Sequence, residues 1–453
     1  MKRTTIALLA LMIPAALLTG CGSAESPAET PAMNAESASE KPHAKDAAGE
    51  PAEAPAAEEA ISADFAADDA GEMVGGEGDR KGALDDAALV AAAEVPSADT
   101  PAEIEEPVEL PPYDSDADAF VLTAGEWNDN ENWGFFSNLV KGDNIEFPSF
   151  GLDPTGRVAV KCERAGEPVR NAAAALYDGS DLIWSAVSDA DGMAYLFYDP
   201  ASNVSETLTL KVEGAEDVTV DASRKADQQN NGKSVSQASY QVELTGDNAV
   251  YDTTEVMFIL DTTGSMSDEI AYLQKDFSSI AEEVAAENVV FSVNFYRDEG
   301  DDYVTKCNPF TDDLRRVQSL LNAEFADGGG DWPEAVADIL SETMSPDVWS
   351  DDTNKIAFLI FDAPPHDGRE EQLQAAISNA AKMGVRLVPV VASNSGRETE
   401  LFGRAAAIMT GANYVFLTDD SGVGDSHLEP IIGDYEVELL HDIIVRNIRE
   451  IAG

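Results

Sequence analysis

One stretch decides the fold: Val256-Met257-Phe258-Ile259-Leu260 runs directly into Asp261-Thr262-Thr263-Gly264-Ser265-Met266. The apolar residues predict a buried strand that ends at Asp261, and apolar residues three and four apart after Ser267 predict an amphipathic helix. Open α/β sheets bind their ligands at the carboxyl ends of their strands. Asp261, Thr263 and Ser265 supply hard oxygen ligands, and the turn contains no His or Cys for a softer metal. The stretch therefore predicts a divalent-cation site, for Mg²⁺ first and for Mn²⁺ or Ca²⁺ as alternatives.

Apolar strands and amphipathic helices alternate from this stretch to the end of the chain. The predicted strands are Val289 to Phe295, Ile356 to Phe361, Val385 to Val391 and Tyr414 to Leu417, with Tyr303 to Thr305 as an antiparallel edge. The predicted helices are Leu314 to Leu321, Val336 to Met344, Leu373 to Ala380, Leu401 to Met409 and a terminal helix that contains Leu440, Ile444 and Ile448. This alternation predicts a sheet with helices on both faces. Residues 249–453 are therefore expected to form a Rossmann-like, doubly wound α/β domain.

The turn after Leu260 resembles the metal-ion-dependent adhesion site of the von Willebrand factor A (VWA) family, which has the pattern D-x-[ST]-x-S. Residues 328–335 look like the second metal loop of that family, and residues 358–366 look like the third. The resemblance covers roughly residues 250 to 450 and implies a binding domain without catalytic activity. It also implies that Thr263 and Ser265 bind the cation directly, with Asp261 and Asp362 bonding either directly or through water. A protein partner would then supply an exposed Asp or Glu carboxylate.

The second loop departs from the best-known family pattern, in which two glycines precede a threonine ligand. The sequence offers Asp331 there, or no side chain at all if Gly330 is the aligned position. Asp331 is either a further metal ligand or the N-cap of the helix that follows Pro333, and one aspartate could do both. As a ligand it would be a third carboxylate, and three carboxylates more than neutralise a divalent ion.

The N-terminus predicts export and lipid anchoring. Lys2 and Arg3 precede an apolar stretch from Ile6 to Leu18, which is too short for a transmembrane helix of roughly 20 residues. The sequence Leu18-Thr19-Gly20-Cys21 resembles the bacterial lipobox, in which the cysteine is diacylated. Residues 1–20 are thus expected to be a lipoprotein signal peptide. Cys21 would anchor the protein to a membrane of the bacterial cell envelope, on its extracytoplasmic side.

Residues 21–112 are dominated by Ala, Glu, Asp, Pro and Ser, with few aromatic residues. Such a composition cannot bury enough apolar surface to offset chain entropy, so we expect a disordered stalk. The formal net charge of the whole chain is −58, with 28 Lys and Arg against 86 Asp and Glu. No basic patch is visible, which argues against a nucleic-acid partner.

Residues 113–248 predict a β-sandwich, because short alternating runs such as Tyr195-Leu196-Phe197 and Leu208-Thr209-Leu210 recur without helical periodicity. The segment from Gly156 to Ala194 resembles the carboxypeptidase regulatory-like, transthyretin-type sandwich, which implies an accessory domain without chemistry. Residues 125–133 are acidic and aromatic. They are interpreted as a packed edge of the sandwich, with a ligand or calcium loop as the alternative.

Two other functions are compatible with the sequence. The domain could be a structural surface domain with an inert metal. The turn from Asp261 to Ser265 also resembles the nucleophile loop of haloacid-dehalogenase-type phosphotransferases, in which a strand-end Asp is phosphorylated with Mg²⁺ assistance. In that case Asp419 and Asp420 could supply further metal-binding acids. No lysine occupies an evident phosphate-binding position, which favours the binding domain.

Overall fold

The computed structural model describes residues 121–142, 144–200, 202–223, 235–246, 249–330, 332–421 and 426–453, all of which lie within one compact unit of the chain. The predicted signal peptide, Cys21, the predicted stalk and Asp331 lie outside these residues. Their expected roles therefore stay predictions.

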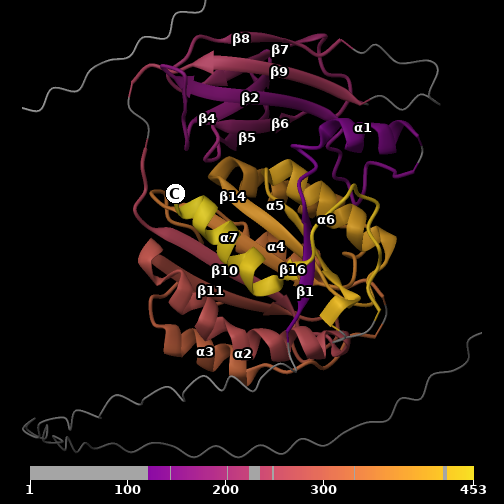
Figure 1. Cartoon of the computed structure of the whole chain (residues 1–453). Helices are drawn as coiled ribbons and strands as arrows, with labels where there is room; N and C mark the ends of the chain where they lie inside the picture. The colour runs from indigo at the N-terminus through magenta and orange to yellow at the C-terminus, as the bar shows by residue number, and fades with distance from the viewer. Residues whose placement is uncertain are drawn as a thin grey trace, which may run out of the picture. The chain divides into compact units, whose positions relative to one another are not determined.

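Eight strands of the described residues form one sheet, the large sheet, which is mostly parallel (Figure 1). In spatial order they are β12 (Thr305–Lys306), β11 (Val289–Tyr296), β10 (Thr254–Asp261), β13 (Asn354–Phe361), β14 (Val385–Val391), β15 (Tyr414–Thr418), β1 (Thr123–Trp127) and β16 (Glu438–Leu439). Strands β11, β10, β13, β14 and β15 are parallel to one another, whereas β12 and β1 run antiparallel to their neighbours. The chain adds strands outward from β10 on one side and from β13 on the other. The strand order therefore reverses between β10 and β13, where doubly wound sheets bind ligands.

The two faces of β10 bury alternate side chains in two hydrophobic clusters. Val256, Phe258 and Leu260 pack in one cluster, whereas Met257 and Ile259 pack in the other. The first cluster contains buried residues of α2 (Ser267–Glu283), α3 (Leu314–Ala323) and α7 (Leu440–Ala452). The second contains those of α4 (Val336–Thr343), α5 (Glu370–Met383) and α6 (Arg397–Thr410). Helices thus cover both faces, and this is why the strand is continuously apolar from Val256 to Leu260.

Residues 156–243, here called the β region, form two four-stranded sheets within the described part of the chain. One sheet contains β2 (Gly156–Arg164), β3 (Glu167–Pro168), β6 (Met193–Phe197) and β9 (Ser236–Glu243). The other contains β4 (Ala173–Asp178), β5 (Asp181–Val187), β7 (Thr207–Val212) and β8 (Val218–Asp221). Buried side chains from both sheets belong to one hydrophobic cluster. The segment predicted to be a sandwich therefore contains two β-sheets with a shared core.

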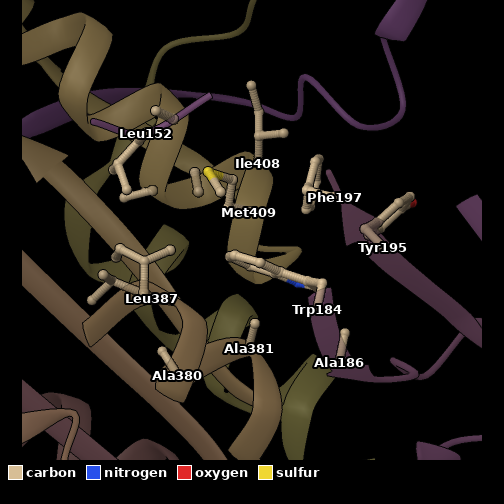
Figure 2. Close-up of a cluster of buried hydrophobic side chains, with 14 of the residues drawn as sticks. Leu152, Trp184, Ala186, Tyr195, Phe197, Ala380, Ala381, Leu387, Ile408 and Met409 are labelled. Atoms are coloured by element: carbon tan, nitrogen blue, oxygen red, sulfur yellow. The ribbon is translucent and has the colours of Figure 1, made fainter. Parts of the chain in front are cut away.

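The β region packs directly on α5 and α6. Figure 2 shows Trp184 and Phe197 of the β region beside Ile408 and Met409 of α6, and all of these side chains are buried in the same cluster. Polar contacts reinforce this packing, because the Arg386 guanidinium donates to the carbonyl oxygens of Val187 (2.7 Å) and Thr410 (2.8 Å). The shared core makes the β region and the large sheet one folded body.

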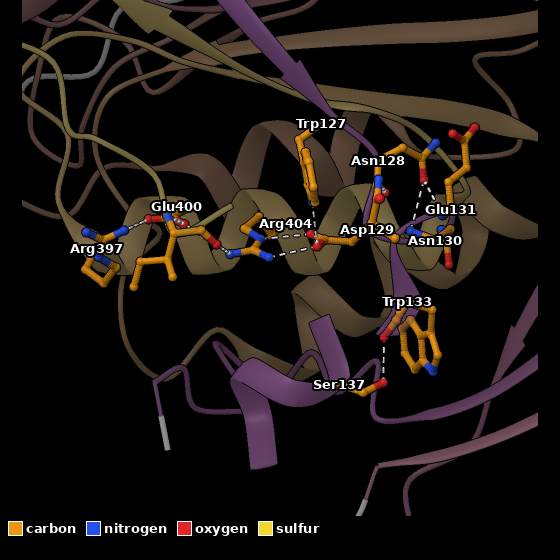
Figure 3. Close-up of polar contacts among 12 residues, drawn as sticks. Trp127, Asn128, Asp129, Asn130, Glu131, Trp133, Ser137, Arg397, Glu400 and Arg404 are labelled. Carbon is orange, nitrogen blue, oxygen red and sulfur yellow. Dashed lines mark hydrogen bonds and ion pairs between the residues drawn. The ribbon is translucent and has the colours of Figure 1, made fainter. Parts of the chain in front are cut away.

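The interpretation of residues 125–133 as an edge of the sandwich was wrong. Strand β1 pairs with β15 from Thr123 opposite Thr418 to Trp127 opposite Tyr414, so it belongs to the large sheet. The following turn brings Asp129 to Arg404 of α6, and both residues are buried (Figure 3). Asp129 accepts two hydrogen bonds from the Arg404 guanidinium, at 2.8 and 2.7 Å. Helix α1 (Trp133–Lys141) follows and contributes its buried face to the core shared with the β region.

In the described part of the chain, none of the helices is both long and apolar enough to span a membrane.

Replacement of Asp129 by Ala should lower the free energy of unfolding by about 3 kcal/mol, because it leaves a buried guanidinium without its bidentate partner. The expected loss is limited by Glu400, which also accepts a hydrogen bond from Arg404 at 3.2 Å. Urea denaturation would measure it, with Asp181→Ala at an exposed strand end as the matched control. Equal midpoints for Asp129→Ala and Asp181→Ala would show that the ion pair does not hold β1 in place.

Candidate metal centre

The candidate site lies at the carboxyl ends of β10 and β13, which are adjacent in the sheet. Asp261 is the last residue of β10, and Asp362 directly follows β13. Both carboxyl groups are buried, with residue exposures of 0% and 2%. Because the two strands are parallel neighbours, their ends place both acids at the same edge of the sheet.

The Asp261 carboxyl group organises the first loop, residues 261–266. Its Oδ1 accepts hydrogen bonds from the Thr263 backbone N–H (2.9 Å) and from the Thr263 hydroxyl (2.6 Å). Its Oδ2 is buried, and the buried hydroxyl of Tyr296 lies near the carboxyl group without forming a hydrogen bond of good geometry. Burial raises the pKa of Asp261 to about 7, and the neighbouring Asp362 adds to this rise. The nearby Tyr296 hydroxyl lowers the pKa of Asp261, and the charge of Asp261 raises the pKa of Tyr296 further after burial. One acceptor oxygen of Asp261 is thus left for a ligand from outside the protein.

Asp362 presents a second orphan oxygen, because its Oδ1 is also buried without a partner. Burial raises the pKa of Asp362, and the nearby hydroxyl of Ser265 opposes this rise. The backbone carbonyl of Asp362 accepts a hydrogen bond from the Thr399 hydroxyl of α6 at 3.1 Å. This contact fixes the start of the third loop, residues 362–366.

Glycines let the second loop, residues 327–335, lie close against the first. Gly328 and Gly329 have φ values of +81° and +71°, in the left-handed region that favours glycine. The Gly264 N–H donates to the Gly328 carbonyl oxygen at 3.3 Å, and the Asp327 N–H donates to the Thr262 carbonyl oxygen at 3.1 Å. A side chain at Gly328 would clash, because its Cβ would lie 2.3 Å from the Asp301 carboxylate. Glycine at position 328 therefore lets the second loop pack against Asp301, whose carboxylate also accepts a hydrogen bond from the Gly329 N–H at 2.9 Å.

Glu334 is a site residue that the sequence analysis missed. It is buried with 4% exposure, and its Oε2 has no hydrogen-bond partner. Its backbone N–H donates to the Pro364 carbonyl oxygen at 3.0 Å, which holds the second loop against the third. Burial raises the pKa of Glu334 to about 9, and the charge of Asp261 is the next cause. One sequence signal could have identified Glu334. It is a carboxylate that lies just before α4, a helix that begins with the apolar residues Val336 and Ala337.

These loops enclose a shallow hollow of about 490 Å³. Its lining residues come from all three loops and from the segment after β14: Thr263, Gly264, Ser265, Gly328, Gly329, Gly330, Trp332, Glu334, Asp362, Ala363 and Asn394. The described residues contain no group of three or more His, Cys, Asp and Glu side chains arranged to hold a metal. A site built on hydroxyls and carboxylates together does not need such a group. The orphan oxygens of Asp261 and Asp362, together with the hydroxyls of Thr263 and Ser265, fit a hard divalent cation, because buried acceptor atoms need a positive partner.

The structure thus brings together four of the five predicted metal ligands. Asp261 and Asp362 supply orphan oxygens at the same edge of the sheet, and Thr263 and Ser265 line the hollow with Asp362. Asp331 lies outside the described residues, so both of its predicted roles stay open.

The acids that phosphotransfer would require are not brought to Asp261. Asp419 and Asp420 follow β15, and β13 and β14 separate that strand from β10. Asp419 instead accepts a hydrogen bond from the His427 backbone N–H at 3.0 Å.

The oxygen-lined hollow lies at the strand-order reversal of a doubly wound sheet, where such sheets bind ligands. Residues 255–423 match the family model of the von Willebrand factor A domain, which supports a VWA domain in this part of the chain. Domains of this family are in general interaction modules, and they commonly bind a divalent cation.

The solved structures that match include the crystal structure of a conserved hypothetical protein, BatB, from Bacteroides thetaiotaomicron. It is 16% identical, with a TM-score of 0.31, and the match covers 44% of this chain and 98% of that one. The search of curated proteins found no match.

The stability of the metal-free protein should depend on pH through Asp261 and Glu334, whose pKa values of about 7 and about 9 exceed their ordinary values of 3.8 and 4.5. Because the folded protein keeps these protons after the unfolded chain has lost them, the free energy of unfolding should fall as pH rises from about 5 to about 9. Urea denaturation with a chelator present would measure this slope. Saturating Mg²⁺ and the variant Asp261→Asn should each reduce the slope of the free energy of unfolding against pH. A slope that neither of them changes would contradict the assignment of this pH dependence to the candidate site.

Proposed function

We propose that the VWA domain is a metal-dependent binding module that captures a protein through a divalent cation. The observation that carries the proposal is the pair of orphan oxygens, Asp261 Oδ2 and Asp362 Oδ1, buried at the edge of the sheet where Thr263 and Ser265 line the hollow. Unpaired buried carboxylates are destabilising, and a bound cation removes that penalty. The metal proposed is Mg²⁺, with Mn²⁺ or Ca²⁺ as alternatives, because the donors are all oxygen atoms.

The proposed partner offers an exposed Asp or Glu carboxylate. The hollow is shallow and open to the surface, so a side chain from another protein can reach a cation bound there. Trp332 lines the same hollow and is 43% exposed, so it supplies an apolar surface beside the cation. Aromatic side chains of this kind are frequent in the contact surfaces of protein complexes. The module acts by binding alone in this proposal, without catalysis.

Removal of the Asp261 carboxylate should abolish divalent-metal binding without unfolding the domain, because the site lies in loops while the apolar strands carry the stability. Calorimetric titration of the purified full-length protein with Mg²⁺, Mn²⁺ and Ca²⁺ would compare the parent with Asp261→Ala. Thr263→Ala and Ser265→Ala should weaken binding less, since each removes a neutral oxygen.

The matched control for this experiment is Asp268→Ala, which removes an acid of the first turn of α2 that does not line the hollow. Equal metal affinity in Asp261→Ala and Asp268→Ala would refute the site. The parent should also retain a surface protein in Mg²⁺ and release it with a chelator, whereas Asp261→Ala should not retain it.

The proposed location is the extracytoplasmic side of a bacterial envelope membrane, with lipid on Cys21. The support is the apolar stretch that ends in the lipobox-like sequence Leu18-Thr19-Gly20-Cys21. The acid-rich residues 21–112 would then separate the folded body from the lipid surface.

The variant Cys21→Ala should lose its lipid, because no other residue of the lipobox-like sequence can carry the acyl chains. It should partition into the aqueous phase in a detergent separation and take up no radioactive palmitate. Labelling of Cys21→Ala at the level of the parent protein would refute the anchor.

A further inference from the structure

Glu269 is a buried acid of the first turn of α2, the helix that follows the first loop. Its residue exposure is 2%, and it is absent from the residues that line the hollow. Its Oε2 is buried without a hydrogen-bond partner. The proposed binding of a cation by Asp261, Thr263, Ser265 and Asp362 does not use Glu269, so this buried carboxyl group needs an explanation of its own.

The Glu269 side chain joins α2 to the segment after β14. Its Oε1 accepts hydrogen bonds from the Ser393 hydroxyl at 2.8 Å and from the Ser393 backbone N–H at 3.3 Å. Ser393 is itself buried, and the next residue, Asn394, lines the hollow. Ser265, in the turn just before α2, lines it from the other segment. One carboxyl group thus ties together two segments that both contribute to the site.

One oxygen of this carboxyl group is left over, and its charge is felt at the site. Burial raises the pKa of Glu269, the Ser393 hydroxyl opposes this rise, and the charge of Asp362 adds to it. A buried carboxylate that is half satisfied and lies near another acid destabilises the fold. A glutamine would keep the contact with Ser393 without that charge. A charge that lowers stability although a neutral isostere exists points to a role in binding.

We infer that Glu269 is a positioning residue of the cation site, which acts through Ser393 and Asp362 without binding the ion itself. This inference rests on the proposed function. The contact with Ser393 keeps the segments of Ser265 and Asn394 in place at the hollow. The negative charge of Glu269 adds to the attraction of the site for a cation. Residues that act on a metal through its ligands typically contribute about tenfold or more to metal affinity.

The test uses the full-length protein at pH 8 and two measurements. Calorimetric titration gives the Mg²⁺ affinity, and thermal unfolding with a chelator gives the Tm of the metal-free protein. Glu269→Gln keeps the shape and the acceptor for Ser393 but removes the charge. We expect it to bind Mg²⁺ about tenfold more weakly than the parent and to have a higher metal-free Tm. A residue that only braced the fold would not move the two quantities in this way.

Two further variants separate charge from contact. Glu269→Ala also removes the acceptor for Ser393, so it should bind Mg²⁺ at least as weakly as Glu269→Gln and have a lower metal-free Tm than that variant. Glu282→Gln is the matched control, because it removes the same charge from an exposed position near the other end of α2. It should keep the Mg²⁺ affinity of the parent.

Parent-like Mg²⁺ affinity in Glu269→Gln overturns the inference, and so does weaker binding that comes with a lower metal-free Tm, because Glu269 would then act through stability alone. An equal loss of affinity in Glu282→Gln would trace the effect to net charge and overturn it as well. In each of these cases the binding module stands if Asp261→Ala abolishes Mg²⁺ binding. If the parent protein does not bind Mg²⁺, the proposed function and this inference fall together.

Discussion

The burial of two like charges at adjacent strand ends is the constraint on which the site depends. Asp261 ends β10 and Asp362 directly follows β13, and neither forms an ion pair with a Lys or Arg of the described residues. Their mutual repulsion in a medium of low polarity can be relieved by protonation or by a bound cation. The three loops are packed closely enough, through backbone hydrogen bonds between Gly264 and Gly328 and between Glu334 and Pro364, to keep the two acids in place. The fold thus maintains two buried carboxyl groups whose repulsion a bound cation would relieve.

Most of the large sheet could be predicted from the sequence, because its central strands are buried on both faces. The predicted strands Val289 to Phe295 and Val385 to Val391 correspond to β11 (Val289–Tyr296) and β14 (Val385–Val391). Continuous apolar runs between amphipathic helices identify such strands without any knowledge of their partners. The first and third loops could be predicted for the same reason, since each directly follows a strand of this kind.

The sequence analysis missed residues whose roles depend on contacts between segments far apart in the chain. A local sequence pattern does not contain such contacts. The partner of β1 is β15, nearly three hundred residues further along the chain, and the alternation in β1 does not distinguish a sandwich edge from an edge of the large sheet. The role of Glu334 follows from its burial and from Gly329 beside it, and both appear only when the loops are packed together. Asp129 lies in a turn, and its role likewise depends on Arg404, which is 275 residues away in the sequence.

The direction of β1 has a mechanical consequence. Thr123, its first residue, lies opposite Thr418 at the carboxyl end of β15, so the polypeptide before β1 leaves the sheet at the edge that carries the metal loops. Tension along that polypeptide would act on Thr123 first and would load the hydrogen bonds between β1 and β15. The bidentate pair of Asp129 and Arg404 follows β1 and would resist the same displacement. If the chain is tethered at Cys21, a pull between membrane and captured partner would run through the large sheet and bypass the β region.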